Sequence, residues 1–413
     1  MWHNYYSVTG IEEALHILAE KRERARIVAG GTDLILELER GVRRGIDTLV
    51  DITRVPCLDE ITMDEDELIH LGPLVTHNAC AASKIIVERA FPLAQACWEV
   101  GAPQIRNRGT VAGNLVTASP ANDTITPLVA LGASVRLASL RGERLVKLEE
   151  FYQGVRRTLM QPDEMLVDIC FPALRANQRG MFIKLGLRRA QAISLVDVAV
   201  MLGFGFKSGD TVPLGVSGAD KVQEVAITLG AVAPTIIHAH NAEIYLKGRE
   251  LCEASIRHAA ELAMQAAAPI DDVRGSAAYR AEMVRVCVTR ALQALHEKRE
   301  RAAYPADPVL LWGKKTAAPA LPGSLLHAAG TPIETRINGK DYTFTTGQDK
   351  TLLRLLREEA GLTGTKEGCD DCECGACMVL VDGQPVNSCS YLAAQAQGRD
   401  VTTVEGLMPA DGL

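Results

Sequence analysis

The most constraining feature of this 413-residue sequence is a group of five cysteines between residues 369 and 389. Four of them follow the order Cys369-x4-Cys374-x2-Cys377, with Cys389 beyond a stretch that has the pattern of a β-hairpin. This is the ligand spacing of plant-type [2Fe–2S] clusters, in which four thiolates hold two irons. Three ligands must then come from one loop folded around the cluster. We therefore predict a small domain built around that loop, with these four cysteines as metal ligands.

Two other interpretations of the same cysteines remain open. Structural zinc is suggested by the two C-x2-C pairs, which begin at Cys369 and Cys374. Only Glu373 separates the pairs, and one residue is too little chain for two knuckles to face each other across one metal. Free thiols are the other alternative. Ligand spacing and softness favour the iron–sulfur cluster, and they leave Cys372 as a spare thiol outside the ligand set.

The other six cysteines are scattered singly through the first 300 residues. The odd total of 11 and the uneven spacing argue against a disulfide framework. We interpret the six as buried small hydrophobic residues. They are Cys57, Cys80, Cys97, Cys170, Cys252 and Cys287.

Composition and charge limit the class of protein further. Hydrophobic residues make up 47% of the chain and charged residues 23%, as in ordinary globular proteins. The 44 basic and 51 acidic residues sum to −7, which gives no reason to expect a nucleic-acid partner. No apolar run reaches the about 18 residues of a membrane span, and the N-terminus lacks the basic head and apolar core of a secretory signal. We therefore expect a cytoplasmic protein.

The first part of the chain has the pattern of an α/β unit followed by a mixed subdomain. Thr9 and Glu12 are spaced as a capping box at the start of a helix. A strand then leads directly into Gly30-Gly31-Thr32-Asp33 and a second helix. The further strands and helices that the periodicity predicts span residues 26–29, 34–40, 48–52, 68–72, 91–100, 134–138 and 165–171.

The rest of the chain divides into an α+β unit, a linker and a small domain. Strands around Phe182 and over 196–206 precede two alanine-rich helices near 250–268 and 276–300. Residues 301–333 are rich in proline and alanine, which is typical of a semi-extended linker that does not pack. We thus predict domains at 1–175 (subdomains about 1–55 and 56–175), 176–300 and 334–413, with the linker at 301–333.

The predicted small domain has two hairpins on either side of one helix. The hairpins turn at Asn338-Gly339 and at Asp382-Gly383, both strong hairpin signals. The helix spans 350–359, with Asp349 as its expected cap. Its buried side chains are predicted to be Leu352, Leu353, Leu355 and Leu356. This arrangement outlines a β-grasp fold.

Two glycine-containing turns are candidate phosphate sites. Gly30-Gly31-Thr32-Asp33 lies between a strand and a helix, where backbone N–H groups attract anions; taken alone, such a segment is also common as a plain turn. Thr110-Val111-Ala112-Gly113-Asn114 is a second turn of small and polar residues. Neither GxGxxG nor GxxxxGK[ST] occurs, so Rossmann and P-loop folds have no support.

The sequence around the clustered cysteines resembles the first iron–sulfur domain of the molybdenum hydroxylases, the family of xanthine dehydrogenase, aldehyde oxidase and carbon monoxide dehydrogenase. The segments that carry the resemblance are Lys366-Glu367-Gly368-Cys369, Glu373-Cys374-Gly375-Ala376-Cys377, Val381-Asp382-Gly383 and Ser388-Cys389. Cys372 departs from that pattern, because the family usually has glycine there.

The glycine turns resemble the two FAD loops of the flavoprotein subunit of the same family. Phe182-x-Lys184, Arg188-Arg189 and Ala231-Val232-Ala233-Pro234-Thr235 look similar as well. The resemblance implies that the pyrophosphate is held by Val28, Ala29, Gly30, Gly31, Thr32, Asp33, Leu34, Ile35, Thr110, Val111, Ala112, Gly113 and Asn114. It places Asp123 at the ribose or adenine side and Leu166 and Lys184 near the flavin. The alternative for Lys184 is an ordinary surface lysine.

Two positions depart from the flavoprotein pattern. Ala112 replaces the first glycine of the second loop, which is tolerable where φ is negative. Ala192 stands where the family often has aspartate, which puts hydrogen bonding near the flavin in question. The implied fold is a multidomain α+β chain, with a two-subdomain FAD-binding fold, an α+β C-terminal flavoprotein domain and a β-grasp [2Fe–2S] domain.

The function implied by the resemblance is that of an oxidoreductase component. Electrons would pass from a molybdopterin centre on a partner subunit, through iron–sulfur, to FAD and then to NAD+ or another acceptor. A second, helical [2Fe–2S] domain is expected in trans or beyond residue 413. The alternatives are a stand-alone flavin/iron–sulfur NAD(P)H reductase and a zinc-binding assembly module. No catalytic acid or base is assigned.

Two histidines outside these motifs are further candidates for a metal site. His238 and His240 stand two residues apart, but no cysteine, histidine or acidic residue accompanies them at ligand spacing. We interpret them as ordinary loop residues.

Overall fold

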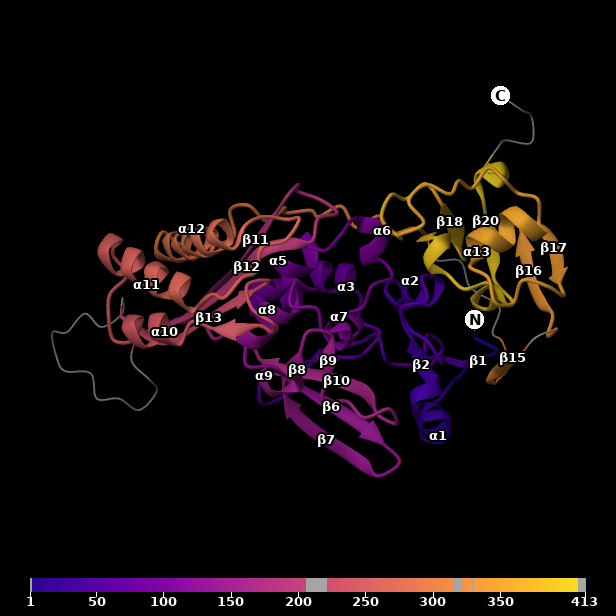
Figure 1. The fold of residues 1–413 in the computed structure, drawn as a ribbon, viewed down its shortest axis with the longest axis horizontal. Helices are drawn as coiled ribbons and strands as arrows, with labels where there is room; N and C mark the ends of the chain where they lie inside the picture. The colour runs from indigo at the N-terminus through magenta and orange to yellow at the C-terminus, as the bar shows by residue number, and fades with distance from the viewer. Residues whose placement is uncertain (1, 206–220, 315–320, 322, 329, 408–413) are drawn as a thin grey trace.

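The computed structural model describes residues 2–205, 221–314, 321, 323–328 and 330–407, and these form four sheets of four or five strands and one two-stranded ribbon (Figure 1). The sheet formed by residues 178–238 and its helices lie at one end, and the sheet formed by residues 333–402 lies at the other (Figure 1). The N-terminal unit lies beside the latter (Figure 1).

The N-terminal unit is a parallel sheet extended by one antiparallel strand. Its strand order is β15-β1-β3-β2, with β1, β2 and β3 parallel. The elements are β1 (Asn4–Ser7), α1 (Ile11–Lys21), β2 (Ala25–Val28), α2 (Leu34–Glu39), β3 (Thr48–Asp51) and β15 (Leu325–Ala328). The expected strand–turn–helix–strand order is confirmed. The capping box is wrong: Gly10 is the N-cap of α1, and the Thr9 hydroxyl instead lies 3.2 Å from Ser324 Oγ.

The second unit is a five-stranded antiparallel sheet with helices on it, in the order β4-β5-β10-β6-β7. Phe91, Phe151 and Phe171 are fully buried in its core. The strands are β4 (Ile61–Met63), β5 (Leu68–Leu71), β6 (Ser134–Ser139), β7 (Gly142–Lys147) and β10 (Met165–Pro172), with a ribbon of β8 (Tyr152–Gly154) and β9 (Arg157–Thr158). The helices are α3 (His77–Ala82), α4 (Lys84–Arg89), α5 (Phe91–Glu99), α6 (Pro103–Arg106), α7 (Val111–Thr117), α8 (Ile125–Ala130) and α9 (Leu148–Phe151).

The third unit is the antiparallel sheet β11-β12-β13-β14, and both of its faces are covered. One face packs on α10, α11 and α12, while the other packs through Phe182 and Ala199 on Ala96 and Ala130 of the second unit. The elements are β11 (Gln178–Gly186), β12 (Ser194–Phe204), β13 (Val222–Gly230), β14 (Ile237–His238), α10 (His240–Leu246), α11 (Glu253–Ala266) and α12 (Ala277–His296). Both predicted helices are confirmed. Residue 206, the expected end of β12, lies outside the described residues.

The proline-rich segment differs from the expected loose linker. Its strand β15 pairs with β1, and its backbone carbonyls accept hydrogen bonds from the second and first units. Asn78 Nδ2 donates to the Leu310 carbonyl at 2.7 Å, and Arg54 donates to the Leu321 carbonyl at 2.8 Å. The carbonyl groups of an extended segment are available as acceptors, and side chains of the first and second units use them.

The C-terminal unit has the mixed sheet β17-β16-β20-β18-β19 with one short helix on it. Both predicted hairpins are confirmed, since Asn338-Gly339 and Asp382-Gly383 all have positive φ. The four predicted leucines are buried, but Thr351, not Asp349, caps the helix. The elements are β16 (Ile333–Ile337), β17 (Lys340–Phe344), α13 (Leu352–Arg354) with a π-helical continuation (Leu355–Glu359), β18 (Met378–Val381), β19 (Gln384–Asn387) and β20 (Asp400–Thr402).

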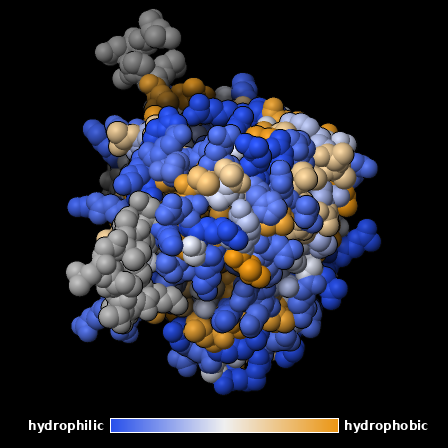
Figure 2. All heavy atoms as spheres, turned by 90° about the vertical axis from the view of Figure 1, so that its left-hand side faces the viewer, coloured by the Kyte–Doolittle hydropathy of each residue, from blue (hydrophilic) through white to orange (hydrophobic). Residues whose placement is uncertain are grey.

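Solvent exposure corrects the interpretation of two single cysteines. Cys80, Cys97, Cys170 and Cys287 are buried as expected, but Cys57 and Cys252 are exposed because they lie in a turn and at the N-cap of α11. Figure 2 shows that the end of the molecule carrying the third unit is mainly hydrophilic, with apolar residues scattered over it. Within the described ranges we find no helix with the length and apolar character that crossing a bilayer requires.

Candidate cofactor site

A cavity of about 620 Å³ lies where the first, second, third and C-terminal units meet. Its walls come from the loop after β2, the start of α7, strand β10, the end of β11 and part of the cysteine loop (residues 369–377). Segments more than 300 residues apart in the sequence therefore share one cavity. The three residues of the cysteine loop that reach it are Asp371, Cys372 and Glu373.

The first glycine loop (residues 29–33) can adopt its path only with glycine at two positions. A Cβ atom added at Gly30 would lie 2.1 Å from the carbonyl oxygen of Arg108, which no side chain tolerates. Gly31 has φ of +77°, in the left-handed region. The backbone of the first loop thus lies directly against the segment that leads into the second loop. This close approach forms a backbone-lined cradle of the kind that binds phosphates.

The second loop (residues 110–114) is the N-terminal part of α7. Thr110 is the N-cap, and its hydroxyl accepts a hydrogen bond from the Gly113 amide at 2.9 Å. Asn114 is held by Thr124 Oγ1, which donates to Asn114 Oδ1 at 2.5 Å. Ala112 lies in the first helical turn, where φ is negative. The alanine that replaces glycine here therefore causes no backbone strain.

The structure brings most of the predicted FAD residues to the cavity. Those that line it are Ala29, Gly30, Gly31, Thr32, Asp33, Leu34, Thr110, Ala112, Gly113, Asn114, Asp123, Leu166 and Lys184. The other three, Val28, Ile35 and Val111, are at most 2% exposed and pack in the hydrophobic cores behind the loops. They support the cradle from behind.

Lys184 and Asp123 form a buried ion pair in the cavity wall. The distance from Lys184 Nζ to Asp123 Oδ2 is 2.6 Å, and the two side chains are 6% and 7% exposed. Ser194 Oγ donates to the other carboxylate oxygen at 2.6 Å, and Lys184 also donates to the Glu99 carbonyl. Burial raises the pKa of Asp123, and Lys184 opposes that rise. The alternative of an ordinary surface lysine is therefore wrong.

The four predicted ligand cysteines lie as two pairs, which suits two metal ions. Cys369 and Cys374 are exposed, and the amide of each donates to the sulfur of the other at 3.3–3.4 Å. Cys377 and Cys389 are buried, with their Sγ atoms 3.3 Å apart. Hydrogen bonds from the amides of Ala376 and Cys369 lower the pKa of the Cys374 thiol, which favours the thiolate that binds metal.

Cys372 is buried beside the second pair of cysteines. It is 3% exposed and packs with Leu353, Cys377 and Cys389. Its φ is +63°, unusual for a residue other than glycine, and its carbonyl accepts a hydrogen bond from Asn387 Nδ2 at 2.6 Å. Because Cys372 also lines the cavity, this one residue contacts both the buried cysteine pair and the cavity.

Two glutamines hold the cysteine loop at the edge of the cavity, and the sequence did not point to either of them. Gln104 Nε2 donates to the Glu373 carbonyl at 3.0 Å, and Gln191 Nε2 donates to the same oxygen. Arg40 forms an ion pair with Asp371. These contacts join residues 182 to 331 positions apart, so no local sequence pattern marks them.

Comparison with known proteins identifies the three parts of the chain. Residues 2–174 match the family described as FAD binding domain in molybdopterin dehydrogenase, residues 182–295 match CO dehydrogenase flavoprotein C-terminal domain, and residues 335–403 match 2Fe-2S iron-sulfur cluster binding domain. The chain is 33% identical over 297 residues to the 6-hydroxypseudooxynicotine dehydrogenase complex subunit alpha of Paenarthrobacter nicotinovorans, covering 72% of this chain and 95% of the relative. The chain belongs to the molybdenum hydroxylase family.

Further members of the molybdenum hydroxylase family show the same likeness. The carbon monoxide dehydrogenase medium chain of Hydrogenophaga pseudoflava is 29% identical over 290 residues, which cover 70% of this chain and 96% of the relative. A solved structure of carbon monoxide dehydrogenase from that organism has a TM-score of 0.65, at 29% identity, over 72% of this chain and 98% of its own.

These findings confirm the fold class and the cofactors. The FAD-binding, flavoprotein C-terminal and iron–sulfur domains occur in the predicted order. The cofactors are FAD and a [2Fe–2S] cluster, so the zinc interpretation of the cysteines is wrong. The chain is an oxidoreductase subunit of its family.

Proposed function

We propose that this chain passes electrons from a molybdopterin centre on a partner subunit, through its [2Fe–2S] cluster and FAD, to NAD+ or another soluble acceptor. The observation that carries the proposal is the shared cavity. Its lining includes both glycine loops and residues 371–373 of the cysteine loop. No intervening domain separates the two cofactor sites within the described residues.

Different residues of the cavity would hold different parts of FAD. The cradle at Gly30 and the second loop would bind the pyrophosphate with backbone N–H groups, and Leu166 would contact the flavin end. FAD supplies the exchange between single electrons from the cluster and electron pairs for the acceptor. Lys184 would keep a positive charge beside the flavin, which favours its reduced, anionic form. Asp123 would hold Lys184 in place through their ion pair, so the ribose or adenine that Asp123 is predicted to bind would also have to lie close to Lys184.

The partner is inferred from the names of the relatives. One is described as a subunit of a dehydrogenase complex and another as a medium chain. We infer a molybdopterin-binding subunit, and a second, helical [2Fe–2S] domain that completes the path to it, with the complex in the cytoplasm. Hydroxylation of the substrate, whether purine, aldehyde, CO or N-heterocycle, would take place on that subunit.

Affinity purification of the tagged full chain from its native host tests the proposal. We expect a molybdenum-containing subunit to co-purify with it. In the absence of oxygen, one member of a panel of purines, aldehydes, CO and N-heterocycles should bleach the absorption of both the cluster and the flavin. The variant pair Gln104→Ala/Gln191→Ala, which loosens the hold on the cysteine loop, should slow flavin reduction more than cluster reduction.

A stand-alone reductase would behave differently in the same purification. If the chain purified alone oxidises NAD(P)H with a soluble acceptor at full rate, and no molybdenum subunit binds to it, the protein is a stand-alone reductase and the proposal is wrong.

A further inference from the structure

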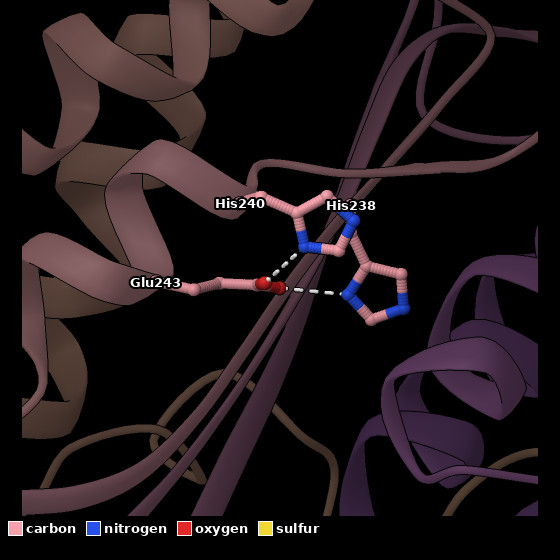
Figure 3. Close-up of side chains that lie close together, drawn as sticks. All are labelled: His238, His240 and Glu243. Carbon is pink, nitrogen blue, oxygen red and sulfur yellow. Dashed lines mark hydrogen bonds and ion pairs between the residues drawn. The ribbon is translucent and has the colours of Figure 1, made fainter.

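His238, His240 and Glu243 converge at the junction between β14 and α10 (Figure 3). Strand β14 ends at His238 and helix α10 begins at His240, so both imidazoles project from one corner of the chain. Glu243 lies one helical turn further along α10. The expectation that no acidic residue accompanies the two histidines is therefore wrong, because α10 brings Glu243 back to them.

The two imidazoles present the same type of nitrogen to one carboxylate. His238 Nδ1 lies 2.7 Å from Glu243 Oε1, and His240 Nδ1 lies 3.0 Å from Oε2. The rings are stacked, with an angle of 3° between their planes. Ligand atoms about 2.0–2.1 Å from a tetrahedral zinc ion lie about 3.3 Å from one another. The three ligand atoms all lie within 4.8 Å of one another, so movement of these side chains, including rotation of one imidazole out of its parallel arrangement, would admit an ion between them.

One group outside the cluster holds a ligand in place, and a second lies close to another ligand. The Ile227 amide donates to Glu243 Oε1 at 2.8 Å. Glu149 of α9 lies 3.9 Å from His238 Nε2, the nitrogen that faces away from the cluster. This distance is too long for a hydrogen bond, but a carboxylate on the far side of a ligating histidine is the common outer partner of a metal ligand, and a small movement of Glu149 would bring it into contact.

Burial and charge agree with a metal site open on one side. The side chains of His238 and Glu243 are 19% and 12% exposed, whereas that of His240 is 75% exposed and leaves a path for an ion from solvent. Two imidazoles and one carboxylate are a donor set that suits Zn²⁺.

We propose that His238, His240 and Glu243 bind one divalent transition-metal ion of the Zn²⁺ type, with solvent as its fourth ligand. The three residues belong to the flavoprotein C-terminal region, and Glu149 behind them belongs to the FAD-binding region. The ion would therefore strengthen the contact between these two regions. The three ligands are not among the residues that line the cofactor cavity, so this site is separate from the redox centres.

Zinc binding to the full chain, loaded with FAD and its cluster, tests the site. The cluster-loaded protein is dialysed against a chelator to remove other divalent metals, incubated with Zn²⁺ alone, desalted and analysed for bound zinc. We expect His240→Ala to bind about one equivalent less zinc than the wild type, as removal of one of three protein ligands requires. Any zinc bound by cysteines is common to both proteins and cancels in the difference. Because His240 is largely exposed, this variant should fold and keep its FAD.

His258→Ala is the matched control. His258 and Glu261 form a similar exposed pair, with Nδ1 and Oε2 3.5 Å apart, but without a second histidine. This variant should bind as much zinc as the wild type. Glu149→Gln should keep the site but weaken zinc affinity by about tenfold, as loss of an outer carboxylate does.

X-ray absorption at the zinc edge identifies the ligands independently. Nitrogen and oxygen neighbours in the wild type, lost in His240→Ala, would support the site. Equal zinc content in the wild type and His240→Ala, or a zinc shell of sulfur only, would show that the three residues form just a hydrogen-bonded cluster and overturn the proposal.

Discussion

Lys184 Nζ lies 2.6 Å from Asp123 Oδ2 in the wall of the cofactor cavity, with both side chains more than nine-tenths buried. Replacing Lys184 by methionine leaves the Asp123 carboxylate buried without its counter-charge. We expect the free energy of unfolding at neutral pH to fall by about 3–5 kcal/mol.

The loss of unfolding free energy in Lys184→Met should depend on pH. Burial raises the pKa of Asp123, and the variant removes the charge that opposes the rise. A raised folded-state pKa means that stability is greatest below the unfolded pKa, about 3.9, and is lost as pH rises. The gap between wild type and variant should therefore widen from about pH 4 upward, as thermal unfolding at several pH values would reveal. The double variant Lys184→Met/Asp123→Asn should show little of this dependence, and a gap independent of pH would contradict the assignment.

Gly30→Ala should damage the flavin site directly. The new methyl group would meet the Arg108 carbonyl at 2.1 Å, so the two loops must separate. We expect a loss of about 1–3 kcal/mol in stability, typical of overpacking, together with reduced FAD content after purification. Gly10→Ala is the control, since no atom lies within 4 Å of its added Cβ and its φ is −145°. Equal FAD content in both variants would contradict the cradle.

Cys372→Gly should leave the cluster intact, whereas Cys369→Ser should abolish its absorption and leave FAD bound. Glycine adopts the positive φ at position 372 without strain, which stabilises the fold, but the variant loses a buried thiol, which destabilises it. The two effects on the free energy of unfolding should therefore offset to within about 1 kcal/mol. Iron and flavin quantitation, with chemical denaturation of both variants, measures the outcome. Loss of iron in Cys372→Gly would show that Cys372 is a ligand.

Loosening the hold of the two glutamines on Glu373 should release the cysteine loop from the cavity. In Gln104→Ala/Gln191→Ala the Glu373 carbonyl loses both of its side-chain donors. We expect faster amide hydrogen exchange over residues 369–377 but unchanged exchange in β16 and β17. Uniformly faster exchange across the whole C-terminal unit would instead indicate that the domain itself is destabilised.

Features set by neighbouring residues could be predicted from the sequence. The Asn338-Gly339 and Asp382-Gly383 turns need only local φ values, and the cluster spacing needs only one loop. The sequence could not show that Thr9 does not cap α1, because Ser324, which its hydroxyl contacts, lies 315 positions away. The same holds for Gln104 and Glu373, whose contact depends on how two domains pack. Glu243 is different: it is close enough in sequence to His240 for helical spacing to have marked it.

The strand β15 has a kinetic consequence for the fused chain. It is fixed in the N-terminal sheet up to Ala328, and β16 of the iron–sulfur domain begins at Ile333. The five Cα-to-Cα steps from Ala328 to Ile333 reach at most about 18 Å when fully extended, so the domain cannot diffuse away from the flavin region. Docking of the cluster domain is thus intramolecular, at a high effective concentration. Electron exchange between the two cofactors should be insensitive to dilution, unlike that between separate subunits.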